Sequence, residues 1–299
     1  MDESIYERYK RSGEIAAKAR DNGVKMIKED GNILDVTSEI ESMIVDNGAE
    51  LAFPVNISIN EIAAHFTPRH DNTSIFKKGE VVKLDVGAHI DGYIADTAIT
   101  VEIGSSKYED MITASKDALD NVIKVMKADI SLSYVGGVIE ETIKSFNFKP
   151  IDNLTGHSLD RYTLHSGLSI PNVYNKGNKR KIKAGDVLAI EPFATNGAGH
   201  VISGKGSNIY RYNQLGKRWI VRNLKTRRLL EKIRRSFKTL PFAERWCTNL
   251  LPNTDSSLKK LLFTGCIKQY PQLCDMAKGI VTQAEHTVLI FEEDCEVTT

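Results

Sequence analysis

Apolar positions recur with the period of a helix in two consecutive stretches at the start of the chain. The first covers residues 3–29, and the second begins after Asn32. Asn47-Gly48 closes the second stretch, because both residue types readily adopt the left-handed backbone that ends helices. The pattern predicts two amphipathic helices, and the run at 51–60 that follows is typical of a strand.

A period of two replaces the helical period in residues 78–101 and predicts a β-hairpin. Two runs rich in Val, Ile and Thr are joined by an Asp-Gly pair, a strong signal for a two-residue turn. Counting back from this turn places Gly87 opposite Asp96. Because side chains alternate between faces, Asp85 shares a face with Gly87 and lies diagonally across from Asp96, roughly 7–8 Å away at Cα.

The two carboxylates of this hairpin face one gap, which Gly87 is expected to leave open. Like charges this close repel unless a cation lies between them. A metal ion, or a pair of ions about 3.5–4 Å apart, would fit the gap. Two solvated carboxylates on an exposed face explain the same pattern, so the hairpin alone leaves both interpretations open.

The second part of the chain repeats the order of elements in the first. Helical patterns return at 107–128 and around 134–146, and the segment KKGEVVKLDVGA of the hairpin resembles KAGDVLAIEPFA further on. In both segments a carboxylate stands six residues after the glycine, Asp85 in one and Glu191 in the other. We expect two duplicated half-domains that direct Asp85 and Glu191 at one centre, with chance similarity of two strand entries as the alternative.

The composition changes in residues 210–279, where Lys and Arg become dense. Residues 222–238 combine apolar positions four residues apart with a basic opposite face, as in an amphipathic helix. We expect a compact helical insertion at 210–279 within a main domain made of 1–209 and 280–299. A solvated surface explains the basic face of 222–238, and contact with ribosomal RNA or another anionic surface is the functional interpretation.

The bulk composition is that of an ordinary soluble globular protein, with 299 residues, a formal net charge of +1 and 41% hydrophobic residues. No apolar run approaches the ~20 residues that cross a bilayer, and the charged start has no apolar signal segment. The four cysteines include no Cys-x-x-Cys pair, which favours reduced thiols over a disulfide or zinc framework. We therefore expect a cytoplasmic protein without a membrane partner.

Acidic and imidazole side chains at predicted strand ends are the candidates for chemistry: Asp85, Asp96, His157, Glu191 and Glu285. Four carboxylates and one imidazole are ligands that suit hard or borderline divalent ions such as Mn, Fe(II) or Co. They suit a thiolate zinc site less well. A pair of ions bridged by carboxylates would lower the pKa of a water between them and give a nucleophile.

The order and spacing of these residues resemble the methionine aminopeptidases. The shared motifs are D-x10-D (Asp85, Asp96), Gly156-His157-Ser158, Glu191-Pro192-Phe193 and Glu285-His286-Thr287. The resemblance covers nearly the whole chain. The helical insertion and the Ala-Ala-His-Phe-Thr-Pro segment around His65 resemble the type 2 branch in its archaeal form. The resemblance implies an α+β fold of the duplicated pita-bread kind. In this fold a pseudo-twofold central antiparallel sheet is flanked by helices, and a winged-helix-like insertion is added.

The resemblance implies that the five candidates hold two divalent ions, drawn from Co, Mn, Fe(II), Zn and Ni. Asp96 and Glu285 would bridge the ions, and Glu191 would also carry the proton of the bridging water or hydroxide. His65 and His165 match the family's two catalytic histidines that are not ligands. These would hydrogen-bond the scissile peptide and stabilise charge that develops in the transition state.

Three apolar residues fall where the family lines its methionine pocket: Phe53, Leu164 and Phe193. Aromatic walls suit a thioether because sulfur–aromatic contacts are favourable. Ile209 stands where the eukaryotic enzymes have a pocket histidine, which is a departure from their pattern.

The implied activity is removal of the initiator methionine from nascent polypeptide N-termini with a small second residue. The expected enzyme is a monomer, with the ribosome as a candidate partner. A proline-specific peptidase of the same fold is disfavoured, because those enzymes carry extra N-terminal domains. A catalytically inactive relative that binds nucleic acid or another partner is the alternative of a different class, and such relatives lose metal ligands.

Overall fold

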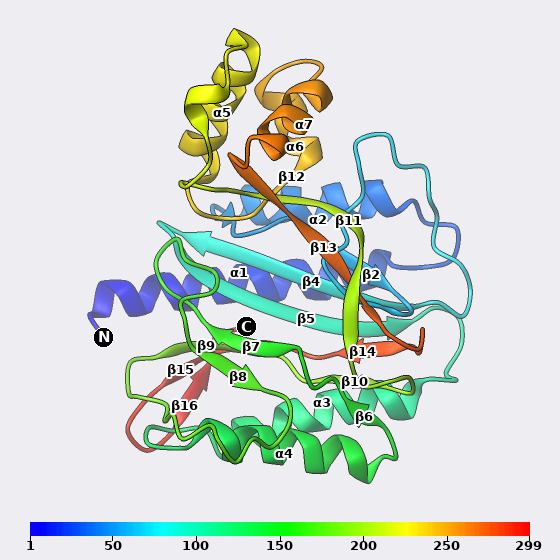
Figure 1. The fold of residues 1–299 in the computed structure, drawn as a ribbon. Helices are drawn as coiled ribbons and strands as arrows, with labels where there is room; N and C mark the ends of the chain where they lie inside the picture. Colours follow the sequence, from blue (N-terminus) through cyan, green and yellow to red (C-terminus); the bar gives the residue numbers. More distant parts are fainter.

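A computed structural model covers residues 1–299 of the chain. Two helices, α1 (Glu3–Met26) and α2 (Ile33–Asp46), open the chain and cover one face of a long hairpin (Figure 1). Each begins at a polar cap, because the Asp2 and Asn32 side chains accept first-turn N–H groups. Both predicted helices are therefore confirmed, and α1 ends three residues before the predicted end.

The hairpin consists of β4 (Val81–Ile90) and β5 (Tyr93–Glu102) and has the predicted register, with Gly87 opposite Asp96. Asp91 and Gly92 have φ of 52° and 91°, as a two-residue turn of type I′ requires. Two short strands, β1 (Glu50–Leu51) and β2 (Asn56–Ile59), pair with β4. Apolar residues of α1 and α2 pack against this sheet in one core cluster.

The second half repeats this plan with α3 (Glu109–Ile123) and α4 (Leu132–Ser145), which pack on shorter strands. One five-stranded sheet has the order β16-β15-β9-β7-β8. Its strands are β7 (Thr155–Ser158), β8 (Ser169–Pro171), β9 (Val187–Ile190), β15 (His286–Ile290) and β16 (Cys295–Val297). A three-stranded sheet lies beside it, formed by β6 (Lys149–Pro150), β10 (Phe193–Thr195) and β14 (Val281–Gln283).

The duplication predicted from the two Lys-x-Gly-acid segments is confirmed by matching hydrogen bonds. Gly79 and Gly185 both have a left-handed backbone, with φ of 82° and 90°. In each turn the following acid accepts the N–H of the residue three positions earlier, Glu80 from Lys77 at 2.9 Å and Asp186 from Lys183 at 2.8 Å. The caps of α2 and α4 form equivalent bridges, Asn32 with Ile75 and Ser131 with Lys181.

The two halves meet at the centre of the molecule. Every pair of neighbouring strands is antiparallel, and the strands form four hydrogen-bonded groups. Backbone hydrogen bonds of 3.3 and 2.9 Å between Ala98 and Glu285 join the hairpin of the first half to the second half. This seam brings the predicted metal ligands of both halves together.

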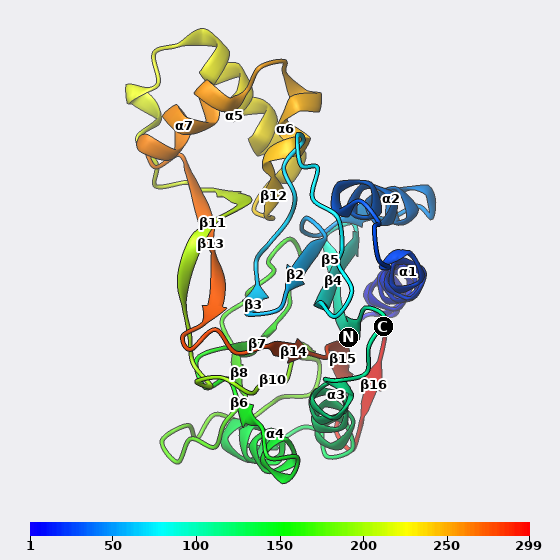
Figure 2. The same ribbon diagram turned by 90° about the vertical axis from the view of Figure 1, so that its right-hand side faces the viewer.

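The basic region forms a projection on a two-stranded ribbon, β11 (Val201–Tyr212) and β13 (Ile267–Asp275) (Figure 2). At its base β13 pairs with β3 (Ile62–Ala64). Its outer part contains a short 3-10 turn (Arg218–Ile220), α5 (Leu224–Phe237), β12 (Phe242–Ala243), α6 (Glu244–Leu250) and α7 (Asp255–Phe263) around their own small core. The predicted boundary at 209/210 falls inside β11, so a continuous strand crosses it.

No helix combines the length and the apolar character needed to span a bilayer. All four cysteines are free thiols, as their spacing predicted.

Candidate metal centre

A cavity of about 70 Å³ lies at the seam between the halves, below the ribbon. Nine of the ten predicted site residues line it: Phe53, His65, Asp85, Asp96, His157, Leu164, His165, Glu191 and Glu285. Phe193 is the exception. The structure therefore brings together side chains that are up to 232 positions apart, from Phe53 to Glu285.

The acidic side chains of the cavity surround the ring of His157. Its Nε2 lies 3.6 Å from Asp96 Oδ2 and 3.7 Å from Glu191 Oε1. Asp96, His157 and Glu285 offer ligand atoms that all lie within 4.8 Å of one another. Gln283 Nε2 donates a hydrogen bond of 3.0 Å to Glu285 Oε2, which orients that carboxylate.

The charges of this cluster are not balanced within the protein. Burial raises the pKa of Asp85 to about 7. Burial, followed by repulsion from neighbouring carboxylates, raises the pKa values of Asp96, Glu191 and Glu285 well above their ordinary range.

Two buried oxygens of the cluster, Asp85 Oδ1 and Asp96 Oδ1, have no hydrogen-bond partner. Burial, followed by the nearby His165, lowers the pKa of His157 to about 3, so its imidazole is neutral, as a metal ligand must be. Unpaired carboxylate oxygens around a neutral imidazole fit divalent cations, and the residues present therefore suit a metal centre.

Backbone contacts across the seam fix the position of Asp96. Its N–H donates to Thr287 Oγ1 at 2.8 Å, and the same hydroxyl donates back to the Asp96 carbonyl oxygen at 2.8 Å. Asp85 stands on the neighbouring strand, His157 on β7, and Glu191 and Glu285 directly follow β9 and precede β15. Strands hold three of the five side chains, and the other two stand directly at strand ends.

Two further histidines, His65 and His165, line the same cavity. His65 follows β3 with a left-handed backbone (φ 66°), which is uncommon for a residue with a side chain. Its Nδ1 lies 3.2 Å from the Pro271 carbonyl oxygen, and its ring packs edge-on against Tyr270. The ring centroid of His165 is 4.3 Å from that of His157.

Both of these histidines are neutral at physiological pH. Burial lowers the pKa of His65 to about 4. Burial, followed by the charge of Arg211, also lowers the pKa of His165. A neutral imidazole has one donor and one acceptor nitrogen, so it can hydrogen-bond a substrate without carrying a charge into the cavity. In His65 the Pro271 carbonyl oxygen takes the donor, which leaves Nε2 as an acceptor.

Apolar residues form the remaining wall, and here two expectations need correction. Gly87 leaves no open gap between the carboxylates, because the ring of Phe53 fills the space: a Cβ at Gly87 would lie 2.1 Å from Phe53 Cε1. Phe193 is buried in a separate cluster with Ala63, Ile151 and Val201. After Glu191-Pro192 the chain leaves β9 and pairs with β14, so Phe193 lies outside the cavity.

A family model described as metallopeptidase family M24 matches residues 7–223. A methionine aminopeptidase of Methanocaldococcus jannaschii is 48% identical over 301 residues, covering 100% of both chains. A methionine aminopeptidase of Pyrococcus abyssi is 43% identical over 96% of this chain and 97% of its own. The chain belongs to metallopeptidase family M24. The resemblance to methionine aminopeptidases that the motifs indicated is confirmed.

Solved structures support the M24 fold. The methionine aminopeptidase of Thermotoga maritima has a TM-score of 0.72 at 22% identity and covers 100% of this chain and 98% of its own. A thermophilic Arx1 has a TM-score of 0.85 at 16% identity, covering 100% of this chain and 91% of its own. At these identities the likeness concerns the fold, and it confirms the duplicated pita-bread α+β architecture.

Several residues that line the cavity of this M24 metallopeptidase were not singled out from the sequence: Asn56, Ala64, Pro241, Tyr270 and Gln283. Strand period could have found Gln283, which stands two residues before Glu285. Pro241 and Tyr270 come from the insertion, where no local pattern pointed to the site. Ile209, the noted departure from the eukaryotic pattern, also lines the cavity.

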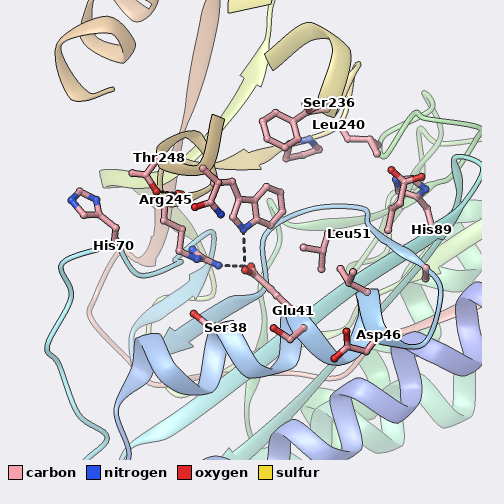
Figure 3. A pocket seen from close by; sticks show the side chains of 18 of the residues that line it. Ser38, Glu41, Asp46, Leu51, His70, His89, Ser236, Leu240, Arg245 and Thr248 are labelled. Carbon is pink, nitrogen blue, oxygen red and sulfur yellow. Dashed lines mark hydrogen bonds and ion pairs between the residues drawn. The ribbon is translucent and has the colours of Figure 1, made fainter. Parts of the chain in front are cut away.

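A second cavity, of about 790 Å³, separates α2 from the insertion (Figure 3). Pro241 lines both cavities. At its floor Glu41 accepts hydrogen bonds from Arg245 and from Trp246 Nε1, the latter at 2.9 Å. Arg245 also donates to Thr67 Oγ1 at 2.7 Å. These buried contacts fix the insertion, and with it Pro241, relative to the metal centre.

Proposed function

We propose that this M24 metallopeptidase removes the N-terminal methionine from polypeptides whose second residue is small. One observation carries the proposal: a single cavity combines a cation-binding cluster, two neutral imidazoles and an apolar wall. An exopeptidase for methionine needs each of these parts, for the peptide bond, the carbonyl oxygen and the thioether chain respectively.

Two divalent cations would be held by Asp85, Asp96, His157, Glu191 and Glu285, with Asp96 and Glu285 between the two positions. Bound there, such ions would supply Lewis-acid polarisation and a water of lowered pKa. Their identity is proposed from the ligand chemistry to be among Co, Mn, Fe(II), Zn and Ni.

The chain's own residues would bind and orient the substrate. Phe53 and Leu164 would pack against the methionine side chain, together with Ile209. His65 Nε2, an acceptor because the ring proton on Nδ1 faces the Pro271 carbonyl oxygen, would accept a hydrogen bond from a peptide N–H. A ring nitrogen of His165 would donate to the carbonyl oxygen and stabilise its negative charge in the transition state. Neutral rings suit these roles, because each carries one donor and one acceptor nitrogen at physiological pH.

Glu191 would act as the proton carrier. Its Oε1 lies 3.7 Å from His157 Nε2, and the residue lines the cavity. Burial and the nearby Asp85 raise its pKa, which makes this carboxylate a readier proton acceptor than an exposed one. It would take a proton from the attacking water and deliver it to the leaving amine nitrogen.

The natural substrates would be nascent chains, because the initiator methionine is present only at new N-termini. We propose a cytoplasmic monomer that acts near the ribosome. The residues 210–279 would form a separate subdomain attached to the catalytic residues 1–209 and 280–299.

The test uses protein stripped with a chelator and then given Mn²⁺ or Co²⁺. We expect release of methionine from Met-Ala-Ser and little from Met-Lys-Ser or from Xaa-Pro peptides. The substitution Asp120→Asn, at an exposed residue of α3, serves as a control that keeps full activity. Absence of release with every metal tried would reject the proposal, and preferential cleavage before proline would reassign the substrate.

A further inference from the structure

The projection on the ribbon has a charge opposite to that of the rest of the molecule. Residues 211–268 contain 15 Lys and Arg and three Asp and Glu, a net charge of +12. The whole chain has +1, so the remaining residues together carry −11. A separation this strong creates a positive field on one end of the molecule and favours a polyanionic partner there.

A groove of about 730 Å³ concentrates this charge between the start of α5 and the side of α7. Three cationic side chains line it: Arg222, Lys259 and Lys260. The one carboxylate of the groove, Asp255, lies 3.6 Å from Arg69, so three cations face a single acid there. The first turn of α5 contains no acidic residue, so its positive helix end adds to the field.

Exposed aromatic rings flank the same groove. Phe263 ends α7 with 92% of its surface exposed, and Trp219 precedes α5 with 78% exposed. The Lys217 N–H donates to the Thr264 carbonyl oxygen at 3.0 Å, which holds the Trp219 segment against the end of α7. Flat exposed rings beside cations suit stacked bases.

A lipid surface fits these observations less well. The apolar face of α5 is not available for insertion into a bilayer, because Leu229, Leu230 and Ile233 are buried in the core of the projection. Isolated rings beside cations without ion-pair partners instead suit a single strand of nucleic acid. The cations would bind its phosphates, and the rings would stack on its bases.

We infer that this groove binds an unpaired strand of RNA, with phosphates on Arg222, Lys259 and Lys260 and a base stacked on Phe263. The negative remainder of the molecule would repel the strand and keep it at the projection. This binding is independent of peptide cleavage, so either proposal can fail without the other.

Fluorescence anisotropy of a labelled single-stranded RNA of about 12 nucleotides tests the inference. The full chain should bind with an affinity that falls steeply between about 50 and 200 mM NaCl. The variant Arg222→Glu/Lys259→Glu/Lys260→Glu should bind at least about tenfold more weakly, and its salt slope should fall by about three. The matched control Lys116→Glu/Lys124→Glu/Lys179→Glu reverses three exposed charges elsewhere and should lose little.

The stacking partner is tested separately. Phe263→Ala should weaken binding roughly five- to a hundredfold, whereas Leu215→Ala, at a residue 90% exposed outside the groove, should not. Activity on Met-Ala-Ser should stay unchanged in all variants. Equal losses in groove and control variants, tighter binding of duplex RNA or of single-stranded DNA, or stronger binding to anionic phospholipid vesicles would each overturn the assignment.

Discussion

The two halves of the duplicated fold supply the proposed metal ligands in different ways. The first half carries Asp85 and Asp96 on one hairpin of two ten-residue strands, joined by a two-residue turn. The second half supplies His157 from the short strand β7 and Glu191 from the end of β9. Glu285 comes from the C-terminal segment, directly before β15. One half relies on local register, the other on long-range packing, and this difference decides what each substitution should do.

Asp96→Asn should have the largest effect, because it removes charge where the two halves meet. A neutral amide holds two cations poorly, so we expect turnover to fall by more than about 10³-fold and metal stoichiometry to fall with it. The fold should survive, because the backbone bonds of Asp96 to Thr287 do not involve its carboxylate. Metal analysis beside the peptide assay checks this, and two tightly bound ions with full activity would contradict the bridging role.

His165→Ala should separate substrate chemistry from metal binding. Its ring lies against His157, but it is not part of the carboxylate cluster. We expect metal content to remain and kcat to fall about 10²–10⁴-fold, if the ring stabilises the transition state. His200→Ala is the control, since His200 pairs with Asp152 on the surface. A wild-type kcat for His165→Ala would assign that ring to packing alone.

The sequence alone predicted the first half in more detail than the second. The Asp-Gly turn set the register of the hairpin, so the pairing of Gly87 with Asp96 followed from counting. The sequence did not predict that Phe53 fills the space beside Gly87, because Phe53 reaches it from a separate segment.

In the second half the sequence predicted which residues matter but not where the chain turns. Phe193 follows Glu191 by two residues, as Gly87 follows Asp85, so strand period would place it beside the site. Pairing of β10 with β14, a contact about 90 residues away in the sequence, directs it elsewhere. The same limit hid Pro241 and Tyr270, which reach the cavity only because the ribbon folds back over it.

Gly87→Ala should expose the dependence of the hairpin on Phe53. An added methyl would lie 2.1 Å from the ring, so Phe53 must move toward the cavity. We expect a loss of about 1–3 kcal/mol in the free energy of unfolding and a raised KM for Met-Ala-Ser with metal content unchanged. The double variant Gly87→Ala/Phe53→Leu should recover stability, and failure to recover would place the strain elsewhere.

Asp275→Asn tests how the second half holds its strands together without a long hairpin. The buried Asp275 carboxylate accepts backbone N–H groups from Ala198, Gly199, Ala277 and Gly279, tying the segments around β10 and β14 together. Burial alone would raise its pKa, but these hydrogen bonds outweigh it and lower the pKa. We expect Asp275→Asn to cost roughly 2 kcal/mol at neutral pH.

The stabilising effect of the Asp275 carboxylate should depend on pH. A folded-state pKa below the unfolded value stabilises the protein above about pH 4, and the contribution is lost as the pH falls through the folded value. Urea unfolding at several pH values should therefore show the difference between wild type and Asp275→Asn shrinking in acid. A difference that stays constant down to low pH would show that the charge is not what holds these segments.

Gly79→Ala and Gly185→Ala should have the smallest effects, and they should be equal. Both glycines are left-handed, and neither would bring an added Cβ within 4 Å of another group, so only backbone strain is introduced. We expect about 1 kcal/mol of destabilisation for each, additive in the double variant because the turns are distant in the fold. Gly137→Ala, inside α4 with ordinary contacts, should instead stabilise by up to about 1 kcal/mol. Unequal costs at Gly79 and Gly185 in thermal or urea unfolding would mean that the repeated turns, despite their matching hydrogen bonds, no longer carry equal shares of the stability of their halves.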